Sequence, residues 1–381
     1  MMPHPPRRIV FTGDFLRPGV AAERPTQHHN IRWLRNLVST PLQMATDLPQ
    51  EVVSWGAANV NDGRLTSADV AAIYHRFGLV RNLSSWAALF DADRLPSSVE
   101  NLLRPLFQDS LVVGFEIPPY LEHFLNREGI PFIGTTIHPV RFLDDILLAF
   151  RSNCPSVRAA LAPCQVSDAF IRTMAGVQKA SAARYFNEEV RPGSALMLMQ
   201  TWYDQSQILD GRFVDATRYL DEIIAFARNH TEFLVKEHPL GANPATIILQ
   251  ARVSNLRLVT GNVYGYLSIP EVSSVLTISS SVGVEAPYFG VRTQFLLRPS
   301  IRMHNPAEPE DTGYMAMQDA FLSADFWRNT LRGLMPVTAP DGVIVPFKPN
   351  RLRISMRSFW NFNEIDTDVT SAMGHQKQAA S

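Results

Sequence analysis

Cysteine is scarce in this 381-residue chain, and the scarcity limits what the cysteines can do. Two are present, Cys154 and Cys164, and two thiols cannot form a metal cluster by themselves. One disulfide between them is compatible with an oxidising compartment. Free thiols in a cytoplasmic protein are the interpretation we favour.

Long apolar runs and an excess of charge of one sign are also missing. No window approaches the ~20 apolar residues of a membrane helix. The N-terminal stretch MMPHPPRRIVF has two arginines but lacks the apolar segment of a signal peptide. The formal net charge of -1 gives no reason to expect nucleic acid as the main partner. We therefore expect a cytoplasmic globular protein.

Short apolar runs alternate along the chain with segments of helical periodicity. The alternation favours parallel sheets with helices on their faces, and the chain is long enough for two cores. The segment RPG at 191–193 is the best candidate for a hinge. We expect an α/β protein with two Rossmann-like, doubly wound domains that face each other across a cleft. The predicted domains are 1–190 and 191–345, followed by a segment, 346–381, that crosses back and has a disordered end.

A run of three serines separates a predicted strand from a predicted helix in VLTISSSVGVEAPYFG, residues 275–290. One serine hydroxyl is enough to cap a helix, so two of Ser279, Ser280 and Ser281 need another explanation. A helix N-terminus with spare hydroxyls is also a ready anion site. The run either holds only its own backbone or binds a phosphate. Glu285 lies on the same predicted helix face as Ser281 and is either a ligand of ribose hydroxyls or a buried carboxylate paired within the fold.

The stretch KEHPL ends another predicted strand with Lys236, His238 and Pro239. By itself His238 is equally well explained as a loop histidine without a ligand. It precedes the serine run by about forty residues, roughly one strand-helix-strand unit, so the two strand ends can be neighbours. Together they offer an imidazole, hydroxyls and helix amides to a monophosphate or diphosphate.

These motifs resemble one family. A strand followed by KxHP, and then a strand ending in SS-x-G-x-E-A-x-x-x-G, is similar to the C-terminal half of bacterial capsule and lipopolysaccharide Kdo transferases, which are related to sialyltransferases that use CMP-sugars. The similarity covers mainly residues 195–300, and FEIPPY and TIHPVRFLDD extend it more weakly into the first half. It implies a GT-B fold in which residues 1–190 bind the acceptor and residues 191–345 bind the nucleotide-sugar, with the HP motif and the serines on the cytidine monophosphate.

The same resemblance assigns the chemistry. QTWYDQS, residues 200–206, follows the first strand of the second domain, and retaining β-Kdo transferases use an aspartate after this strand. Asp204 is then the nucleophile, with Gln200 and Tyr203 as substrate ligands. The alternative is an ordinary turn aspartate. The implied reaction transfers Kdo from CMP-Kdo, with retention through a covalent Asp adduct, to a surface glycan or a lipid-linked glycan.

Other polar residues end predicted strands of the first domain. Glu116 precedes two prolines that fix its loop, and it is our candidate general acid or base, with His138 as the alternative. Arg141 is expected to pair with the carboxylate of the sugar, although a salt bridge with Asp144 or Asp145 is as well founded. Asp14 is a further candidate with little to support it.

The sequence also lacks a Gly-rich phosphate loop and a DxD motif at a strand end. We therefore expect transfer without a metal or another cofactor. The basic residues Lys348, Arg351, Arg353 and Arg357 are either a contact with the membrane surface or a solvated face. Two alternatives stay open: the donor is a UDP- or GDP-sugar, or the protein binds sugars without catalysis.

Overall fold

The computed structural model describes residues 5–18, 27–55, 64–238, 243–305, 307–308, 311–340, 342, 352–353 and 355–356. Two compact units are present. The first contains residues 1–138, 147–166 and 302–362, and the second contains 139–146, 167–301 and 363–381. Pro239 and three of the four basic residues, Lys348, Arg351 and Arg357, lie outside the described residues, as does most of the predicted segment 346–381.

The first unit is built on a six-stranded sheet in the order β13-β5-β4-β3-β1-β2. Its strands are β1 (Arg8–Gly13), β2 (Gln50–Val52), β3 (Ser110–Phe115), β4 (Phe132–Ile137), β5 (Leu148–Ser152) and β13 (Met315–Met317). The four strands from β2 to β4 are parallel, whereas β5 and β13 extend the sheet in antiparallel pairing. The residues of β1, β3 and β4 are almost entirely buried, because helices cover both faces of the sheet.

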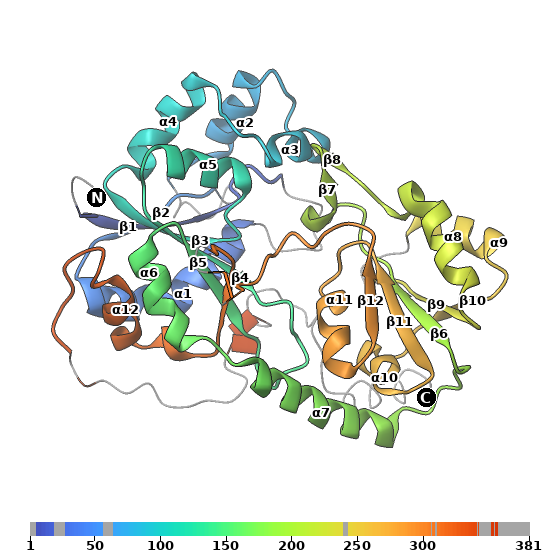
Figure 1. The fold of residues 1–381 in the computed structure, drawn as a ribbon. Helices are drawn as coiled ribbons and strands as arrows, with labels where there is room; N and C mark the ends of the chain where they lie inside the picture. Colours follow the sequence, from blue (N-terminus) through green and yellow to red (C-terminus); the bar gives the residue numbers. More distant parts are fainter. Residues whose placement is uncertain are drawn as a thin grey trace, which may run out of the picture. The chain divides into compact units, whose positions relative to one another are not determined.

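Helices cover both faces of this sheet (Figure 1). They are α1 (Gln27–Thr46), α2 (Ser67–Arg76), α3 (Leu83–Phe90), α4 (Ser97–Phe107), α5 (Pro119–Arg127), α6 (Pro155–Leu161) and α12 (Ala324–Leu331). Helices α1, α6 and α12 pack together in one layer, and α2 to α5 form the other. The N-caps of α2 and α3 are Thr66 and Asn82, whose side chains accept backbone amide protons, so local sequence determines where these helices begin.

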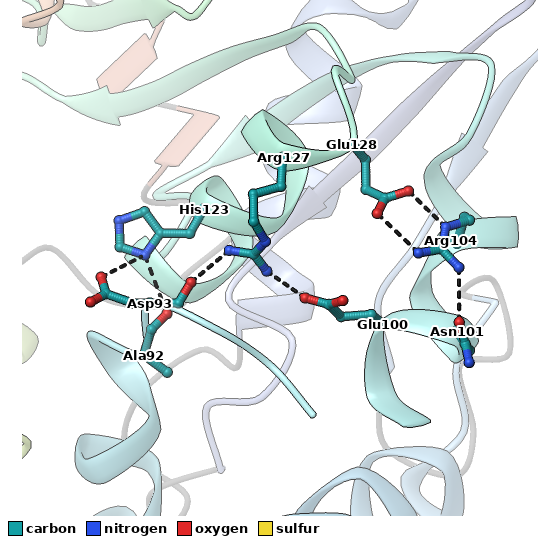
Figure 2. Close-up of polar contacts among 8 residues, drawn as sticks. All are labelled: Ala92, Asp93, Glu100, Asn101, Arg104, His123, Arg127 and Glu128. Carbon is teal, nitrogen blue, oxygen red and sulfur yellow. Dashed lines mark hydrogen bonds and ion pairs between the residues drawn. The ribbon is translucent and has the colours of Figure 1, made fainter. Parts of the chain in front are cut away.

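Ion pairs connect helices α4 and α5 in the layer formed by α2 to α5 (Figure 2). Arg104 of α4 forms a bidentate pair with Glu128, and Arg127 of α5 reaches Glu100 of α4. His123 of α5 lies 3.6 Å from a carboxylate oxygen of Asp93. The Arg104 guanidinium holds the pKa of the Glu128 carboxyl below its usual value. These contacts are partly exposed to solvent and stabilise the helices only modestly.

The second unit has a five-stranded parallel sheet in the order β10-β9-β6-β11-β12. Its strands are β6 (Ser194–Leu198), β9 (Phe233–Lys236), β10 (Leu256–Val259), β11 (Val272–Thr277) and β12 (Arg292–Phe295). The helices are α7 (Asp168–Tyr185), α8 (Leu220–Arg228), α9 (Pro244–Arg252), α10 (Val263–Ser268) and α11 (Val282–Glu285). A short hairpin, β7 (Ile208–Leu209) and β8 (Arg212–Phe213), is inserted after β6.

The predicted fold class, α/β with two Rossmann-like doubly wound domains, is confirmed, and the first sheet additionally carries the antiparallel strands β5 and β13. The division of the chain differs from the predicted boundaries at 190 and 345. Helix α7 belongs to the second unit, where Lys179 donates to the carbonyl of Phe289 at 3.0 Å. The segment that begins at residue 302 returns to the first unit, where β13 pairs with β5.

Two smaller expectations are also answered. Cys154 and Cys164 are both free, the first buried and the second exposed. In the described part of the chain, no helix has the length and apolar character needed to cross a membrane.

Candidate functional site

The carboxyl ends of three adjacent strands in the second unit bring the predicted donor-site residues together. In the order β10-β9-β6-β11-β12, chain connectivity reverses direction between β6 and β11, which is where open α/β sheets bind ligands. The loop with Asp204 follows β6, and the serine run follows β11. His238 follows β9, on the other side of β6. The sequence predicted that the strand ends with His238 and the serines are direct neighbours. Instead β6 lies between β9 and β11, so the ends of these two strands are two strand spacings apart, about 10 Å.

A hydrogen-bond network joins the loops after β6 and β11. The side-chain oxygen of Gln200 accepts from the backbone amide of Ser279 at 2.9 Å, and its Nε2 donates to Oγ of Ser206 at 3.1 Å. The hydroxyls of Ser206 and Ser279 lie 2.9 Å apart. Gln200 and Ser279 are each only 6% exposed. Gln200 was predicted as a substrate ligand, but both ends of its side-chain amide form hydrogen bonds that connect the two loops.

The carboxylate of Asp204 belongs to the same network through one of its two oxygens. Oδ1 accepts from the backbone amide and from the hydroxyl of Ser206, both at 3.0 Å. Asp204 thereby caps the short 3-10 turn Gln205–Gln207. Within the described residues Oδ2 has no hydrogen-bond partner. The turn-aspartate interpretation and the nucleophile interpretation are compatible, because the turn uses Oδ1 and leaves Oδ2 for a reactant.

Two aromatic residues precede Asp204 in the chain, and Asp204 itself is half-buried. Trp202 and Tyr203 contact edge to face with ring centroids 5.3 Å apart, and Trp202 also packs against Phe213 of β8. Trp202 is nevertheless 51% exposed, a large apolar surface at the rim of the Asp204 loop. Exposed apolar surface of this kind is found at sites that bind ligands or other proteins.

The three serines have three different environments. Ser279 is buried in the network, and Oγ of Ser280 accepts from the amide of Val282 at 3.4 Å. Ser281 is the N-cap residue of α11, yet its hydroxyl makes no capping bond. Because α11 has four residues, the expected helix dipole is weak and the helix amides contribute less than predicted. Ser280 and Ser281 are the serines left for a ligand.

Lys236, the last residue of β9, and His238, two residues beyond it, have different surroundings. The ammonium of Lys236 donates to the carbonyl of Thr260, beyond β10, at 3.1 Å, and burial lowers the pKa of Lys236. Lys236 is thus engaged on the β10 side of the sheet, away from the serines, and its contact with a phosphate stays a prediction. His238 is half-buried at the carboxyl end of the strand.

Glu285 is completely buried, so it does not face a ribose. Its Oε1 accepts from the backbone amide of Arg141 at 2.6 Å and from the hydroxyl of Tyr264 at 3.0 Å. Burial raises the pKa of Glu285 to about 7 against the lowering effect of these partners. Phe142, also buried, packs edge to face on Phe289 at 5.1 Å. The alternative interpretation of Glu285, a buried carboxyl paired within the fold, is the one that the structure supports.

These contacts explain why Arg141 is not in the first unit. The prediction assigned His138 and Arg141 to the same strand end of the first domain. The chain instead crosses after His138, and residues 139–146 pack into the second unit through Phe142 and the Arg141 amide. His138 is 4% exposed and its amide donates to the carbonyl of Leu147, so His138 is a poor candidate for a base that meets substrate.

Glu116 has an unusual backbone at the carboxyl end of β3. Its φ is +48°, in the left-handed region that favours glycine. The side chain is half-buried, and one carboxylate oxygen lies 3.4 Å from Oγ1 of Thr136. In the first sheet the chain order reverses between β1 and β3, so Glu116 lies at the ligand-binding position of that sheet. A strained residue at such a place is a reason to assign it a function.

Asp14 ends β1 at the same position, and its side chain is buried with full hydrogen bonding. It accepts from the indole of Trp86 at 2.7 Å and from the hydroxyl of Tyr120 at 2.9 Å. Burial raises the pKa of Asp14 to about 6, and the nearby charge of Arg17 opposes this. Asp14 therefore organises its loop and does not face a reactant.

Ser206 is the functional candidate that sequence reasoning missed. The D-x-S spacing of Asp204 and Ser206 is typical of a capped turn, which was the available signal. Nothing local to this turn indicated that Ser206 also contacts Ser279, 73 residues away. Among the described residues, no group of three or more His, Cys, Asp or Glu side chains is arranged to hold a metal ion.

Comparisons with known proteins add the following. No family model and no curated protein matches the chain. Among solved structures it is similar to a β-Kdo 2,7 transferase, KpsC of Thermosulfurimonas dismutans, with 14% identity and a TM-score of 0.34 over 54% of this chain and 71% of that one. The β-Kdo 2,4 transferase of the same KpsC has 12% identity and a TM-score of 0.29 over 48% and 67%. A UDP-GlcNAc 2-epimerase from Neisseria meningitidis, bound to UDP-GlcNAc, has 12% identity and a TM-score of 0.25 over 98% and 99%. The chain is thus similar to members of the family that its motifs resemble, at identities too low to transfer a function.

Proposed function

We propose that the protein is a glycosyltransferase that moves an acidic sugar, Kdo, from CMP-Kdo to a bacterial surface glycan. The observation that carries the proposal is the position of Asp204, His238 and the serine run at the carboxyl ends of three adjacent strands in one parallel sheet. Transfer from a nucleotide-sugar needs hydrogen-bond donors for the phosphate, here hydroxyls and an imidazole, and a nucleophile or base within reach of the anomeric carbon. This edge of the sheet offers both.

In the proposed donor site, Ser280, Ser281 and His238 contact the phosphate of cytidine monophosphate. Two half-buried hydroxyls and an imidazole donate to phosphate oxygens without a metal ion. The charge that develops on the leaving phosphate is then stabilised by positioned donors. Turnover is expected to survive EDTA, and activity that disappears with EDTA and returns with magnesium or manganese contradicts this part of the proposal.

In the proposed reaction, Oδ2 of Asp204 attacks the anomeric carbon, the bond to the CMP oxygen breaks, and CMP leaves. An acceptor hydroxyl then attacks the anomeric carbon of this Asp-sugar ester, the bond from that carbon to Oδ2 breaks, and the Asp204 carboxylate is released, which gives net retention. The hydroxyl has to lose a proton, and Glu116 of the first unit is our candidate base. His138 is the less favourable alternative because it is buried. Arg141 remains a candidate for the sugar carboxylate.

The deciding experiment is a thermal-shift comparison of CMP, UDP and GDP with the full chain. A ligand at one hundred times its dissociation constant adds about 2.7 kcal/mol of stability. We expect a clear rise in melting temperature with CMP and little with UDP or GDP. Selective stabilisation by UDP or GDP would change the donor class. No response to any of the three would favour a sugar-binding protein without transferase activity.

A further inference from the structure

A second polar site lies in the first unit, at the carboxyl ends of β1 and β2. Four aromatic side chains, from four segments, donate hydrogen bonds to three consecutive residues of the loop after β1. Trp86 and Tyr120 donate to the carboxylate of Asp14. Trp55 donates to the carbonyl of Phe15 at 2.6 Å, and Tyr74 donates to the carbonyl of Leu16 at 2.7 Å.

The two indoles that hold this loop each carry a guanidinium on a ring face. Arg81 stacks on Trp55 at 3.9 Å from the ring centroid, and Arg17 stacks on Trp86 at 4.7 Å. Stacking uses the face of a guanidinium and leaves the N–H groups of its edge for hydrogen bonds. Nη1 of Arg81 also donates to Oγ of Ser67 at 2.8 Å, which fixes the orientation of the fork.

In the described part of the chain, this loop brings together two guanidiniums, of Arg17 and Arg81, and one carboxylate, of Asp14. Asp14 lies near Arg17 and lowers the net charge there. Among the described residues Arg81 has no carboxylate partner, although it is only half-exposed and its burial lowers its pKa. A partly desolvated cation without a counter-ion is costly unless a ligand supplies one.

We propose that Arg81, positioned on Trp55, binds a carboxylate or phosphate group of the acceptor. The anion supplies the counter-charge that no described residue gives Arg81, and it accepts hydrogen bonds from the edge of the guanidinium. The assignment of this anion to the acceptor rests on the proposed function, whereas the anion site itself does not. The proposal thereby specifies the chemical class of the acceptor, which is a glycan with an acidic sugar or a phosphate near its reactive end.

The test uses the two indoles as local reporters. The full chain is labelled with 5-fluorotryptophan, and the ¹⁹F signals of Trp55 and Trp86 are assigned with Trp→Phe variants. The labelled protein is titrated at constant ionic strength with Kdo monosaccharide, with glycerol 3-phosphate and with neutral galactose, each in the presence of saturating CMP. We expect a saturable shift of the Trp55 signal with at least one anion and none with galactose. A response to Kdo alone identifies a carboxylate site, a response to glycerol 3-phosphate alone identifies a phosphate site, and a response to both identifies a general anion site.

Arg81→Gln should weaken the responding anion about tenfold or more, as expected for the loss of a charge-assisted pair. Arg76→Gln is the matched control, because Arg76 lies at the end of α2 and donates to the carbonyl of Ser98 instead. The proposal is overturned if no anion moves the Trp55 signal, if galactose moves it equally, or if Arg81→Gln binds the anion like the unsubstituted protein. Stabilisation by CMP must be unchanged in Arg81→Gln, so a failure of this site is distinguishable from a failure of the donor site.

Discussion

The hydroxyl oxygens of Ser206 and Ser279 lie 2.9 Å apart and connect the loops that follow β6 and β11. Through Ser206 the contact extends to Oδ1 of Asp204, and through Gln200 it extends to the amide of Ser279. The proposed nucleophile and the proposed phosphate loop are therefore parts of one hydrogen-bonded unit. A movement of the serine run on nucleotide binding would therefore change the position of the Asp204 carboxylate.

Asp204→Asn should leave CMP binding intact and reduce turnover about a thousandfold, because an amide is a far poorer nucleophile than a carboxylate. CMP thermal shifts and initial rates measure the two effects. Intact-mass analysis after incubation with donor alone should show a sugar-sized addition that maps to Asp204 and is missing in the variant. Substantial activity in Asp204→Asn, or an inverted product, returns Asp204 to the role of a turn residue.

Ser206→Ala should lower kcat about tenfold with little change in the KM of the donor, because it removes the hydroxyl that orients Oδ1 of Asp204. Ser206→Thr keeps the hydroxyl and should restore most of the rate. Steady-state kinetics of the three proteins decide the matter. Equal losses in the Ala and Thr variants would indicate a packing effect and not a positioning role.

His238→Ala, and the double change of Ser280 and Ser281 to Ala, should each weaken CMP binding by roughly 1.5–3 kcal/mol, the expected loss for a hydrogen bond to a charged phosphate. Isothermal titration gives the affinity, and the melting temperature without ligand reports whether the fold is intact. Ser273→Ala is a suitable control, since Ser273 lies near the amino end of β11 and donates to the carbonyl of Ser194. Unchanged CMP affinity in both test variants contradicts the phosphate assignment.

Glu285 should make stability fall as pH rises toward and through 7. Its folded-state pKa of about 7 exceeds its ordinary value of 4.5, so the folded protein keeps this proton longer than the unfolded chain does. The contribution is complete below 4.5 and is lost as the pH rises through about 7, with a size of the order of 3 kcal/mol. Melting temperatures from acidic to mildly alkaline pH should therefore fall more steeply for the unsubstituted protein than for Glu285→Gln. The exposed Glu222→Gln serves as the control, and parallel profiles for the unsubstituted protein and Glu285→Gln would argue against this assignment.

Glu116→Gly should cost activity without costing stability. A non-glycine residue in the left-handed region costs about 1 kcal/mol, which glycine relieves, while the loss of a catalytic base lowers turnover about a hundredfold. Asp109→Gly is the matched control, because Asp109 has a φ of +56° just before β3. Denaturant unfolding and acceptor turnover are measured for both. Full activity in Glu116→Gly would remove Glu116 from the mechanism.

The amino-acid sequence by itself determined the buried strands and the polar residues at their ends. The apolar runs of β1, β3, β6, β9 and β11 were predictable because burial on both faces of a parallel sheet leaves a continuous apolar signal within four to six residues. The stretches after them were predictable because polar turn residues interrupt that signal. Asp204, His238 and the serine run were found in this way.

Only the tertiary structure decided how those strand ends are grouped and what each side chain does. β6 lies between β9 and β11, β13 returns to β5, and residues 139–146 pack into the second unit around Glu285 and Phe142. Ser206 meets Ser279 across 73 residues, and Glu285 meets the Arg141 amide across 144. Local patterning reports whether a side chain is buried, but it carries no information about which distant residue buries it. The partners of Glu285, Gln200 and Lys236 therefore became known only when the strands were ordered in space.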